Sequence, residues 1–306
     1  MLIKTVTGDI KAKDIHGPVL PHEHLAIDLR RPGDTQGYLT DVAPVANELH
    51  EAKQRYGLGL VVDQTARGMG RDVEKLRLIS QQAEVPIVAA TGWYYSTFHP
   101  SGELTDIESA LDLLRRDITI GIDGTEVKAG VIGEIGTHAE QPTPTERVSF
   151  LAAGRAAKQY NLPLSTHAAL GKGVAAQLEL LTESGVDFSR VSIGHQDLFA
   201  NTEQHKMIAE TGAYVAFDTV GKSSYQSDDT RIQLLIALLE LGHERNILLS
   251  NDISRYGYLV SEGGTGYSHV LGTFAGRLRD IGIDDATLDL LYRRNPLRWL
   301  SGAEID

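Results

Sequence analysis

Two histidines stand one residue apart in the stretch "GPVLPHEHLAID", residues 17–28. His22 and His24 follow a short apolar run that is typical of a buried strand. Because side chains alternate along a strand, both imidazoles point to the same side. Two imidazoles on one side can share a metal ion, but an HxH pattern alone is a weak signal, since a histidine at a strand end is more often a hydrogen-bonded structural residue.

Four further residues of ligand type stand at the ends of other apolar runs. They are Glu134 in "VIGE", His167 in "LSTH", His195 in "SIGH" and Asp252 in "LLSND". This recurrence is a more specific signal than any one histidine. The chain has no cysteine, so a metal must be held by imidazoles and carboxylates.

The order of these residues along the chain suggests chemistry with two metal ions. The two histidines of the first run can share one ion, and Glu134 can bridge it to a second ion held by His167 and His195. Asp252 can complete the first ligand set and take a proton from a metal-bound hydroxide. Such ligands suit Zn²⁺, with Mn²⁺ or Co²⁺ as alternatives. Two ions of this kind activate water and polarise the bond under attack.

The elements that must position these residues are eight short apolar runs with helical patterns between them. Apolar spacing near 3.6 predicts helices over 71–83, 145–160, 171–184 and 229–242. Alternating strands and helices predict an α/β fold with a parallel sheet. The runs that predict strands are 17–20, 59–64, 85–91, 129–134, 162–167, 190–195, 213–218 and 246–252.

Eight such units favour a (β/α)₈ barrel, also called a TIM barrel, as a single domain over residues 1–306. The alternative is a doubly wound open sheet, but "RGMGRD" (67–72) lacks the third glycine of a dinucleotide-binding loop. In a barrel, the carboxyl ends of the strands form one rim, where active sites are built. The candidate ligands fall at the ends of strands one, four, five, six and eight, and would therefore meet at that rim.

The composition excludes several classes of protein. The formal net charge is -12, which argues against nucleic acid as a partner. No apolar stretch approaches the length of a membrane span, and the first residues show no secretory signal, so a soluble cytoplasmic protein is expected. The expected partner is a small-molecule substrate. We interpret the other seven histidines as surface or loop residues; they are residues 16, 50, 99, 138, 205, 243 and 269.

The motifs "PHEHL", "TGWYY", "GEIG", "LSTH", "IGHQD", "SNDISR" and "NPLRWL" together resemble the phosphotriesterase family of the amidohydrolase superfamily. The resemblance runs from about residue 17 to residue 300. It implies a distorted (β/α)₈ barrel with a binuclear metal centre, and a homodimer as one assembly found in the family. Many members bridge the two ions with a carboxylated lysine. Here Glu134 stands in its place, which resembles the phosphotriesterase homology proteins that use glutamate.

The resemblance also implies roles for particular residues. His22, His24 and Asp252 would hold the more buried ion, and His167 and His195 the more exposed one. A hydroxide between the ions would attack a carbonyl carbon or phosphorus, and Asp252 would accept its proton. A tyrosine in the position of Tyr94, within "TGWY", lies beside the metals in lactonase relatives. Tyr94 is thus a candidate to orient substrate, with packing against the rim as the alternative.

Three residues in the loops after the last two strands are candidates for binding an anionic substrate. Lys222 lies in "DTVGKSSY", and Arg255 and Tyr258 lie in "DISRYGY". Family members that hydrolyse phosphorylated sugar lactones are similar here. A lysine, an arginine and a tyrosine hydroxyl can bind a phosphate or carboxylate. The alternative is that Arg255 pairs with a nearby carboxylate, such as Asp228 or Asp229, and that Lys222 is solvated.

The sequence therefore predicts a metal-dependent hydrolase of an ester-like bond. A lactone is the expected substrate, and a phosphorylated sugar lactone is a specific candidate. The alternative is a phosphotriesterase or phosphodiesterase on the same metals. A binding protein without catalysis is a remote alternative, because it would be expected to lack some of the ligand residues.

Overall fold

Eight parallel strands form the centre of the computed structural model, which describes residues 1–305. Neighbours along the sheet follow the order β3, β6, β7, β8, β9, β10, β11, β12, so consecutive strands pair in turn. This is the order of a (β/α)₈ barrel, and the predicted fold is confirmed. The strands are β3 (Val19–Glu23), β6 (Leu60–Asp63), β7 (Ile87–Thr91), β8 (Val131–Thr137), β9 (Leu164–Ala168), β10 (Val191–Ile193), β11 (Tyr214–Phe217) and β12 (Ile247–Leu249).

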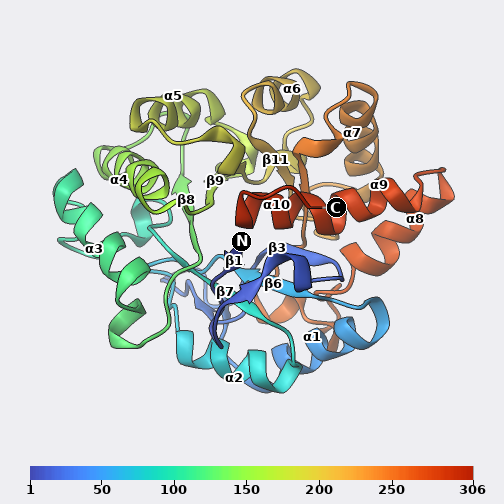
Figure 1. Cartoon of the computed structure of the whole chain (residues 1–306), viewed down its shortest axis with the longest axis horizontal. Coiled ribbons are helices and arrows are strands. Elements are labelled where there is room, and N and C mark those ends of the chain that lie inside the picture. Colours follow the sequence, from blue (N-terminus) through green and yellow to red (C-terminus); the bar gives the residue numbers. More distant parts are fainter. Residues whose placement is uncertain (306) are drawn as a thin grey trace.

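Helices follow most of these strands and surround them, as Figure 1 shows for α1 to α7. Two five-residue π-helices, Val270–Phe274 and Leu290–Arg294, lie near the end of the chain, and short 3₁₀ turns occupy several loops. The helices are α1 (Val42–Tyr56), α2 (Val73–Ala83), α3 (Ile107–Thr119), α4 (Pro144–Tyr160), α5 (Val174–Ser184), α6 (Thr202–Glu210), α7 (Asp228–Glu240), α8 (Ala275–Asp280), α9 (Asp285–Asp289) and α10 (Asn295–Ser301).

Local sequence accounts for where several helices begin and end. Thr143 accepts a hydrogen bond from the amide of Glu146, whose carboxylate accepts one from the amide of Thr143, so α4 begins with a capping box. Pro144 fits the first turn, where no amide hydrogen is needed. At the other end of α1, Gly57 adopts a left-handed conformation (φ 71°), which a glycine does without strain.

The eight predicted strands and the four predicted helices are all present, with boundaries shifted by a few residues. Six helices were not predicted: α1, α3, α6, α8, α9 and α10. In α1 the buried positions are Val45, Ala46, Leu49 and Ala52, so half of its inner face is alanine. This weakens the hydrophobic period that sequence reading depends on. Two small antiparallel ladders were also not predicted; they pair β1 (Leu2–Ile3) with β2 (Ile10–Lys11) and β4 (Ile27–Asp28) with β5 (Tyr38–Leu39).

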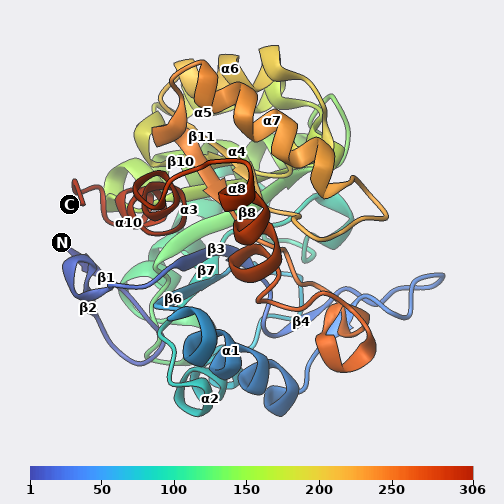
Figure 2. The same cartoon turned by 90° about the vertical axis from the view of Figure 1, so that its right-hand side faces the viewer.

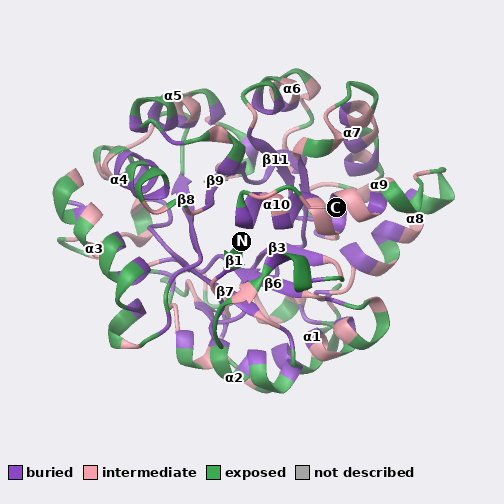
Figure 3. Ribbon diagram, in the orientation of Figure 1, coloured by how far each residue is buried: buried purple, intermediate pink, exposed green. Residues whose placement is uncertain are grey.

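The strands are buried on both faces, and exposed residues concentrate on the outer sides of the helices (Figure 3). A continuous apolar cluster fills the layer between strands and helices. Each fully buried leucine, isoleucine or valine contributes about 2 kcal/mol through removal of its side chain from water. Among residues 1–305, no helix is both long enough and apolar enough to cross a membrane.

The terminal helix α10 covers the amino-terminal end of the barrel. The indole of Trp299 is buried and donates to the carbonyl oxygens of Arg190 (3.1 Å) and Leu164 (3.3 Å), where β10 and β9 begin. Figure 2 shows both chain termini on this side and β4 on the opposite side. The carboxyl-terminal rim, where the candidate ligands lie, is therefore left uncovered by the terminal helix.

The barrel closes between β3 and the segment that follows β12. The amide of Asp252 donates to the carbonyl oxygen of His22 (3.2 Å), and the amide of His24 donates to that of Ile253 (3.2 Å). The amide of His22 also donates to the hydroxyl of Ser250 (3.1 Å). The closing hydrogen bonds thus involve the same short segments that carry candidate ligands.

Candidate metal centre

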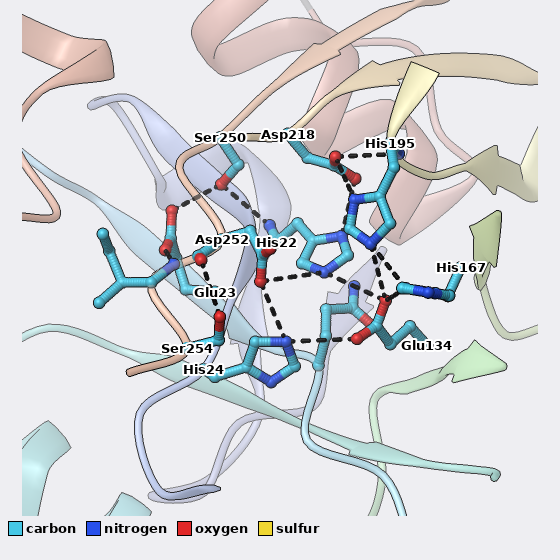
Figure 4. A network of polar contacts seen from close by, with 12 residues as sticks. His22, Glu23, His24, Glu134, His167, His195, Asp218, Ser250, Asp252 and Ser254 are labelled. Atoms are coloured by element: carbon cyan, nitrogen blue, oxygen red, sulfur yellow. Dashed lines mark hydrogen bonds and ion pairs between the residues drawn. The ribbon is translucent and has the colours of Figure 1, made fainter. Parts of the chain in front are cut away.

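The carboxyl ends of five strands bring all six predicted ligand residues together, as Figure 4 shows. Two groups have ligand atoms that all lie within 4.8 Å of one another: His22 with His24 and Asp252, and His22 with Glu134 and His195. All the residues in these groups are buried. His167, the remaining predicted residue, adjoins the second group.

Glu134, on β8, lies at the middle of the cluster. Its Oε1 is 3.3 Å from Nε2 of His24, and its Oε2 is 3.5 Å from Nε2 of His22. The same Oε2 is 3.2 Å from Nδ1 of His167 and 3.5 Å from Nε2 of His195. The carboxylate therefore faces the histidines of the first strand and those of strands β9 and β10 together.

The carboxylate of Asp252 lies on the far side of the first pair of histidines. Its Oδ1 is 3.3 Å from Nε2 of His24 and 4.0 Å from Nε2 of His22. On the other side of the cluster, Nε2 of His195 and Nδ1 of His167 are 2.7 Å apart. The two sets of nitrogen atoms thus converge from opposite sides on Glu134.

One buried atom in this cluster lacks the partner that a cation would provide. Nε2 of His22 has no hydrogen-bond partner within residues 1–305, although it is buried and points at two carboxylates. An unsatisfied buried polar atom is costly. A divalent metal ion would satisfy it, and nitrogen and oxygen donors without sulfur are the ligand set expected for zinc and similar ions. The residues present therefore fit a metal centre.

The electrostatics favour ionised carboxylates at this site. Burial opposes ionisation of Glu134, but the neighbouring His167 and His22 hold its pKa well below the usual value. Burial likewise opposes ionisation of Asp252, and the ammonium of Lys222 together with His24 lowers its pKa. Both groups are thus available as anionic ligands.

Sequence reasoning missed Asp218, which follows β11 and orients two of the histidines. Its Oδ1 accepts hydrogen bonds from the amide of His195 (2.9 Å) and lies 2.8 Å from Nδ1 of that ring. Its Oδ2 lies 2.9 Å from Nδ1 of His22. By holding the Nδ1 atoms, Asp218 turns both Nε2 atoms toward the centre, the arrangement seen behind metal-binding histidines. Thr65 does the same for His24, with its hydroxyl 3.0 Å from Nδ1.

Sequence reasoning also missed Glu23, which lies between the two histidines of β3 and points away from the cluster. Its Oε1 accepts hydrogen bonds from the Ser250 hydroxyl (2.8 Å) and from the backbone and side-chain amides of Asn251 (2.9 Å each). Its Oε2 accepts one from the amide of Ile253 (2.9 Å). Glu23 thus fixes the segment that carries Asp252.

Two of the candidate ligands adopt a left-handed backbone conformation. His195 has φ 59° and Asp252 has φ 52°, values that are uncommon outside glycine. Each residue lies just after its strand, where the chain turns sharply. Such strain persists only where surrounding contacts enforce it, and it concentrates at functional sites.

A cavity of about 310 Å³ opens above the cluster. Its wall includes Tyr94, Tyr95 and Phe98 from the loop after β7, together with Lys222, Arg255 and Tyr258. Tyr94 is buried; its hydroxyl is 3.4 Å from Nε2 of His167, and the two rings meet edge to face with centroids 4.6 Å apart. Tyr94 therefore lies beside the candidate ligand His167 and also packs against the rim, so the two alternatives hold together.

The structure brings the three candidate anion-binding residues to this cavity, but two of them are already paired. Lys222 is buried, not solvated: its ammonium contacts Asp252 and lies 4.9 Å from the ring centroid of Tyr258. Arg255 pairs with Asp34, at 2.9 and 3.1 Å.

Arg255 pairs with a carboxylate, as the alternative interpretation predicts, but Asp228 and Asp229 are the wrong partners. Asp228 lies 3.0 Å from Arg231 and 2.7 Å from His269, and Asp229 pairs with Arg277. The partner of Arg255 comes instead from a segment near the start of the chain.

One of the histidines interpreted as surface or loop residues is neither. His205 lies in α6 and is fully buried, with its Nε2 2.9 Å from the carbonyl oxygen of Gln196. It belongs to the packing between α6 and the turn that follows His195. Because the neighbours of His205 in the sequence are polar, no hydrophobic pattern shows which face of the helix it occupies.

Comparison with known proteins decides the family. Residues 1–300 match the profile of the phosphotriesterase family. The chain belongs to the phosphotriesterase family. The prediction of a metal-dependent hydrolase is thereby confirmed.

Relatives in this family carry several different names. A phosphotriesterase homology protein of Escherichia coli is 39% identical over 288 residues, which cover 94% of this chain and 98% of the relative. Its crystal structure, with phosphate in the active site, superposes with a TM-score of 0.90. An N-acetyltaurine hydrolase of Rattus norvegicus is 33% identical over 85% of this chain and 78% of its own length. The crystal structure of a lactonase from Listeria monocytogenes gives a TM-score of 0.91 at 25% identity, and covers 99% of this chain and 100% of the lactonase.

Proposed function

We propose that this chain is a binuclear metal-dependent hydrolase that cleaves a lactone, with a phosphorylated sugar lactone as the specific candidate. The observation that carries the proposal is the position of Glu134, whose two carboxylate oxygens face histidines from both sides of the cluster. A carboxylate in this position can bridge two cations. It needs no modification to do so, unlike a lysine, which must first be carboxylated.

The six residues divide into two ligand sets that share Glu134. His22, His24 and Asp252 form one set, and His167 and His195 form the other. Zn²⁺ is the first candidate for both sets, and Mn²⁺ or Co²⁺ suit the same donors. Two such ions, when bound, activate water and polarise the carbonyl oxygen of the substrate.

Asp252 is the residue that accepts the proton lost by the attacking water. Its Oδ1 faces His24, while its other oxygen contacts the ammonium of Lys222. The lysine thus fixes the orientation of the carboxylate and favours its ionised form. General base catalysis requires such a group within hydrogen-bond reach of the proton it removes.

Tyr94 and its neighbours orient the substrate and limit access of water. Tyr94, Tyr95 and Phe98 pack against one another, with ring centroids 4.3 to 5.6 Å apart, and form one wall of the cavity. The hydroxyl of Tyr94 lies next to His167 and can donate a hydrogen bond to a substrate bound there. Lys222, Arg255 and Tyr258 line the same cavity and are candidates for binding an anionic group of the substrate.

Two relatives favour other bonds on the same site. The E. coli relative holds phosphate in its active site, which supports a phosphoester as the second candidate. The N-acetyltaurine hydrolases, at 28–34% identity, support an amide with an anionic tail. A lactone and an amide share a planar carbonyl carbon, whereas a phosphoester is attacked in line at phosphorus. A binding protein without catalysis is disfavoured because all six ligand positions are filled.

The test is a hydrolysis panel on protein reconstituted with Zn²⁺ or Mn²⁺. The panel contains a five-carbon sugar lactone with and without its terminal phosphate, N-acetyltaurine, and a neutral phosphotriester. We expect the lactones to be hydrolysed fastest and the metal-free protein to be inactive. If the phosphotriester or N-acetyltaurine were hydrolysed faster, the enzyme would be assigned to that type of bond in place of the lactone. Inactivity toward all four compounds would overturn the proposal.

A further inference from the structure

Three cationic side chains line the cavity above the candidate metal centre: Lys222, Arg255 and Arg31. Lys222 contacts the carboxylate of Asp252, and Arg255 forms two hydrogen bonds with the carboxylate of Asp34. The charges of these two residues are therefore offset by groups of the protein itself. The charge of Arg31 remains to be considered.

Arg31 differs from the other two cations. No carboxylate of residues 1–305 lies within 4.0 Å of its guanidinium, which instead lies over the ring of Phe98, 5.4 Å from its centroid. The side chain is exposed and belongs to the cavity wall. The side chain of Arg31 also hydrogen-bonds to the hydroxyl of Tyr95, another residue of the cavity wall. Stacking on Phe98 and this one hydrogen bond hold the guanidinium in place and leave its other N–H groups available to a ligand.

The backbone around Arg31 is held in a defined turn. Arg31 and Asp34 exchange hydrogen bonds between their amides and carbonyl oxygens, at 3.0 and 2.9 Å, around Pro32 and Gly33. Gly33 has φ 89°, a conformation that favours glycine. The turn lies between β4 and β5, and this segment extends on the side of the barrel away from the termini (Figure 2).

The same turn is tied across the cavity. The carboxylate of Asp34 binds Arg255, which comes from the loop after β12 and is separated from it by 221 residues in sequence. Both terminal nitrogens of the guanidinium, Nη1 and Nη2, take part, so the contact fixes orientation as well as distance. Asp34 therefore positions the turn, and through it Arg31, over the cavity.

We propose that Arg31 binds the anionic end of the substrate and determines the preference of the enzyme for charged over neutral substrates. The ligand class is a small molecule with a hydrolysable carbonyl group and a terminal phosphate or sulfonate. This inference rests on the proposed function. A guanidinium recognises such groups through two parallel N–H donors. The ion pair between Asp34 and Arg255 acts as a support for this residue.

The test compares Arg31→Met with a matched neighbour, Arg30→Met. Arg30 is also exposed and lies over an aromatic ring, but it binds the carboxylate of Asp28 and is outside the cavity wall. With the phosphorylated lactone, Arg31→Met should raise KM by about 10-fold or more, with kcat within a factor of two. KM for the lactone without phosphate should not change. Arg30→Met should match the wild type with both substrates.

A binding measurement separates this inference from the proposed function. Calorimetric titration of the metal-loaded protein with ribose 5-phosphate reports anion binding without turnover. We expect Arg31→Met to weaken this binding by about 10-fold and Arg30→Met to leave it unchanged. Equal effects of the two variants, or equal changes in KM for the charged and neutral lactones, would overturn the role of Arg31. If Arg31→Met weakens binding but the wild type hydrolyses no lactone, the anion-binding role of Arg31 would be supported and the lactone would be overturned as the substrate.

Discussion

The backbone amide of Asp252 donates a hydrogen bond to the carbonyl oxygen of His22 (3.2 Å), so the seam at which the barrel closes runs through the candidate metal centre. These residues are separated by most of the chain, yet both offer ligand atoms to one group. Closing the barrel therefore also assembles the site. Changes that weaken the seam are expected to reduce metal binding even where they touch no ligand.

Glu23 provides a test of how much the seam contributes to stability. Glu23→Gln replaces one carboxylate oxygen with an NH₂ group that cannot accept a hydrogen bond. The oxygen lost is the acceptor either for the amide of Ile253 or for the groups of Ser250 and Asn251. We expect a loss of about 2–4 kcal/mol in the free energy of unfolding, because a buried hydrogen-bond network loses its partner. Urea unfolding measures it. The exposed Glu262→Gln serves as control, and an equal effect in both variants would contradict the role of Glu23.

Asp252→Asn tests the proposed proton acceptor. The amide keeps the shape of the side chain but cannot accept the proton or contribute a full negative charge. We expect the fold to persist, by circular dichroism and thermal unfolding, while kcat falls by about 10²–10⁴-fold. Asp229→Asn, on an exposed residue paired with Arg277, should leave kcat unchanged. A normal rate in Asp252→Asn would show that another group takes the proton.

Asp218→Asn tests the residue that orients His22 and His195. The amide can hold only one of the two ring nitrogens as an acceptor, so one imidazole loses its preferred orientation. Metal affinity, measured by competition with a chromophoric chelator, should fall by about 10- to 100-fold. Asp187→Asn, at an exposed turn, is the matched control. Unchanged affinity in Asp218→Asn would mean that the two rings are held by packing alone.

Glu146 gives the chain a predicted pH dependence of stability away from the metal centre. Burial raises the pKa of this carboxyl, but hydrogen bonds from the amides of Ser96 and Thr143 outweigh it, and the net pKa lies below the usual 4.5. A carboxyl whose pKa is lower in the folded state stabilises the fold at pH values above the pKa of the unfolded chain. That contribution is lost as the pH falls through the pKa of the folded state.

The comparison of wild type with Glu146→Gln isolates this effect. At pH 7 the variant should be less stable by about 1 kcal/mol, since the cap of α4 loses a charged acceptor. The difference should shrink as the pH is lowered below about 4.5, where the wild-type carboxyl begins to take up its proton. Urea unfolding at a series of pH values measures it. A difference that stays constant with pH would assign the effect to packing.

The sequence was sufficient to predict the barrel and the clustering of six residues of ligand type at its rim, for a physical reason. Parallel strands buried on both faces are short apolar runs, and the polar residues that end them share one rim. Glu23 escaped notice because alternation turns it away from its neighbouring histidines, toward a segment more than 220 residues distant. Asp218 is the last residue of a predicted strand, but its role in orienting His22 and His195 depends on the two imidazoles lying next to it in the folded chain.

The contacts of the cavity wall were less predictable. Arg255 was compared with carboxylates close to it in sequence, whereas its partner Asp34 lies on a turn between two strands of two residues each. Strands this short carry no hydrophobic period. Which charges pair across a rim depends on the paths of loops, and these are fixed by tertiary contacts more than by local sequence.

The most direct test of the account is the number of metal ions bound per chain, measured by mass spectrometry of the metals in reconstituted wild type and Glu134→Gln. The amide keeps the shape of the side chain but removes the charge that the bridge requires. The account predicts about two ions per chain in the wild type and fewer in the variant. A wild type that binds none, or a variant that retains both, would contradict the assignment of this cluster as a binuclear centre.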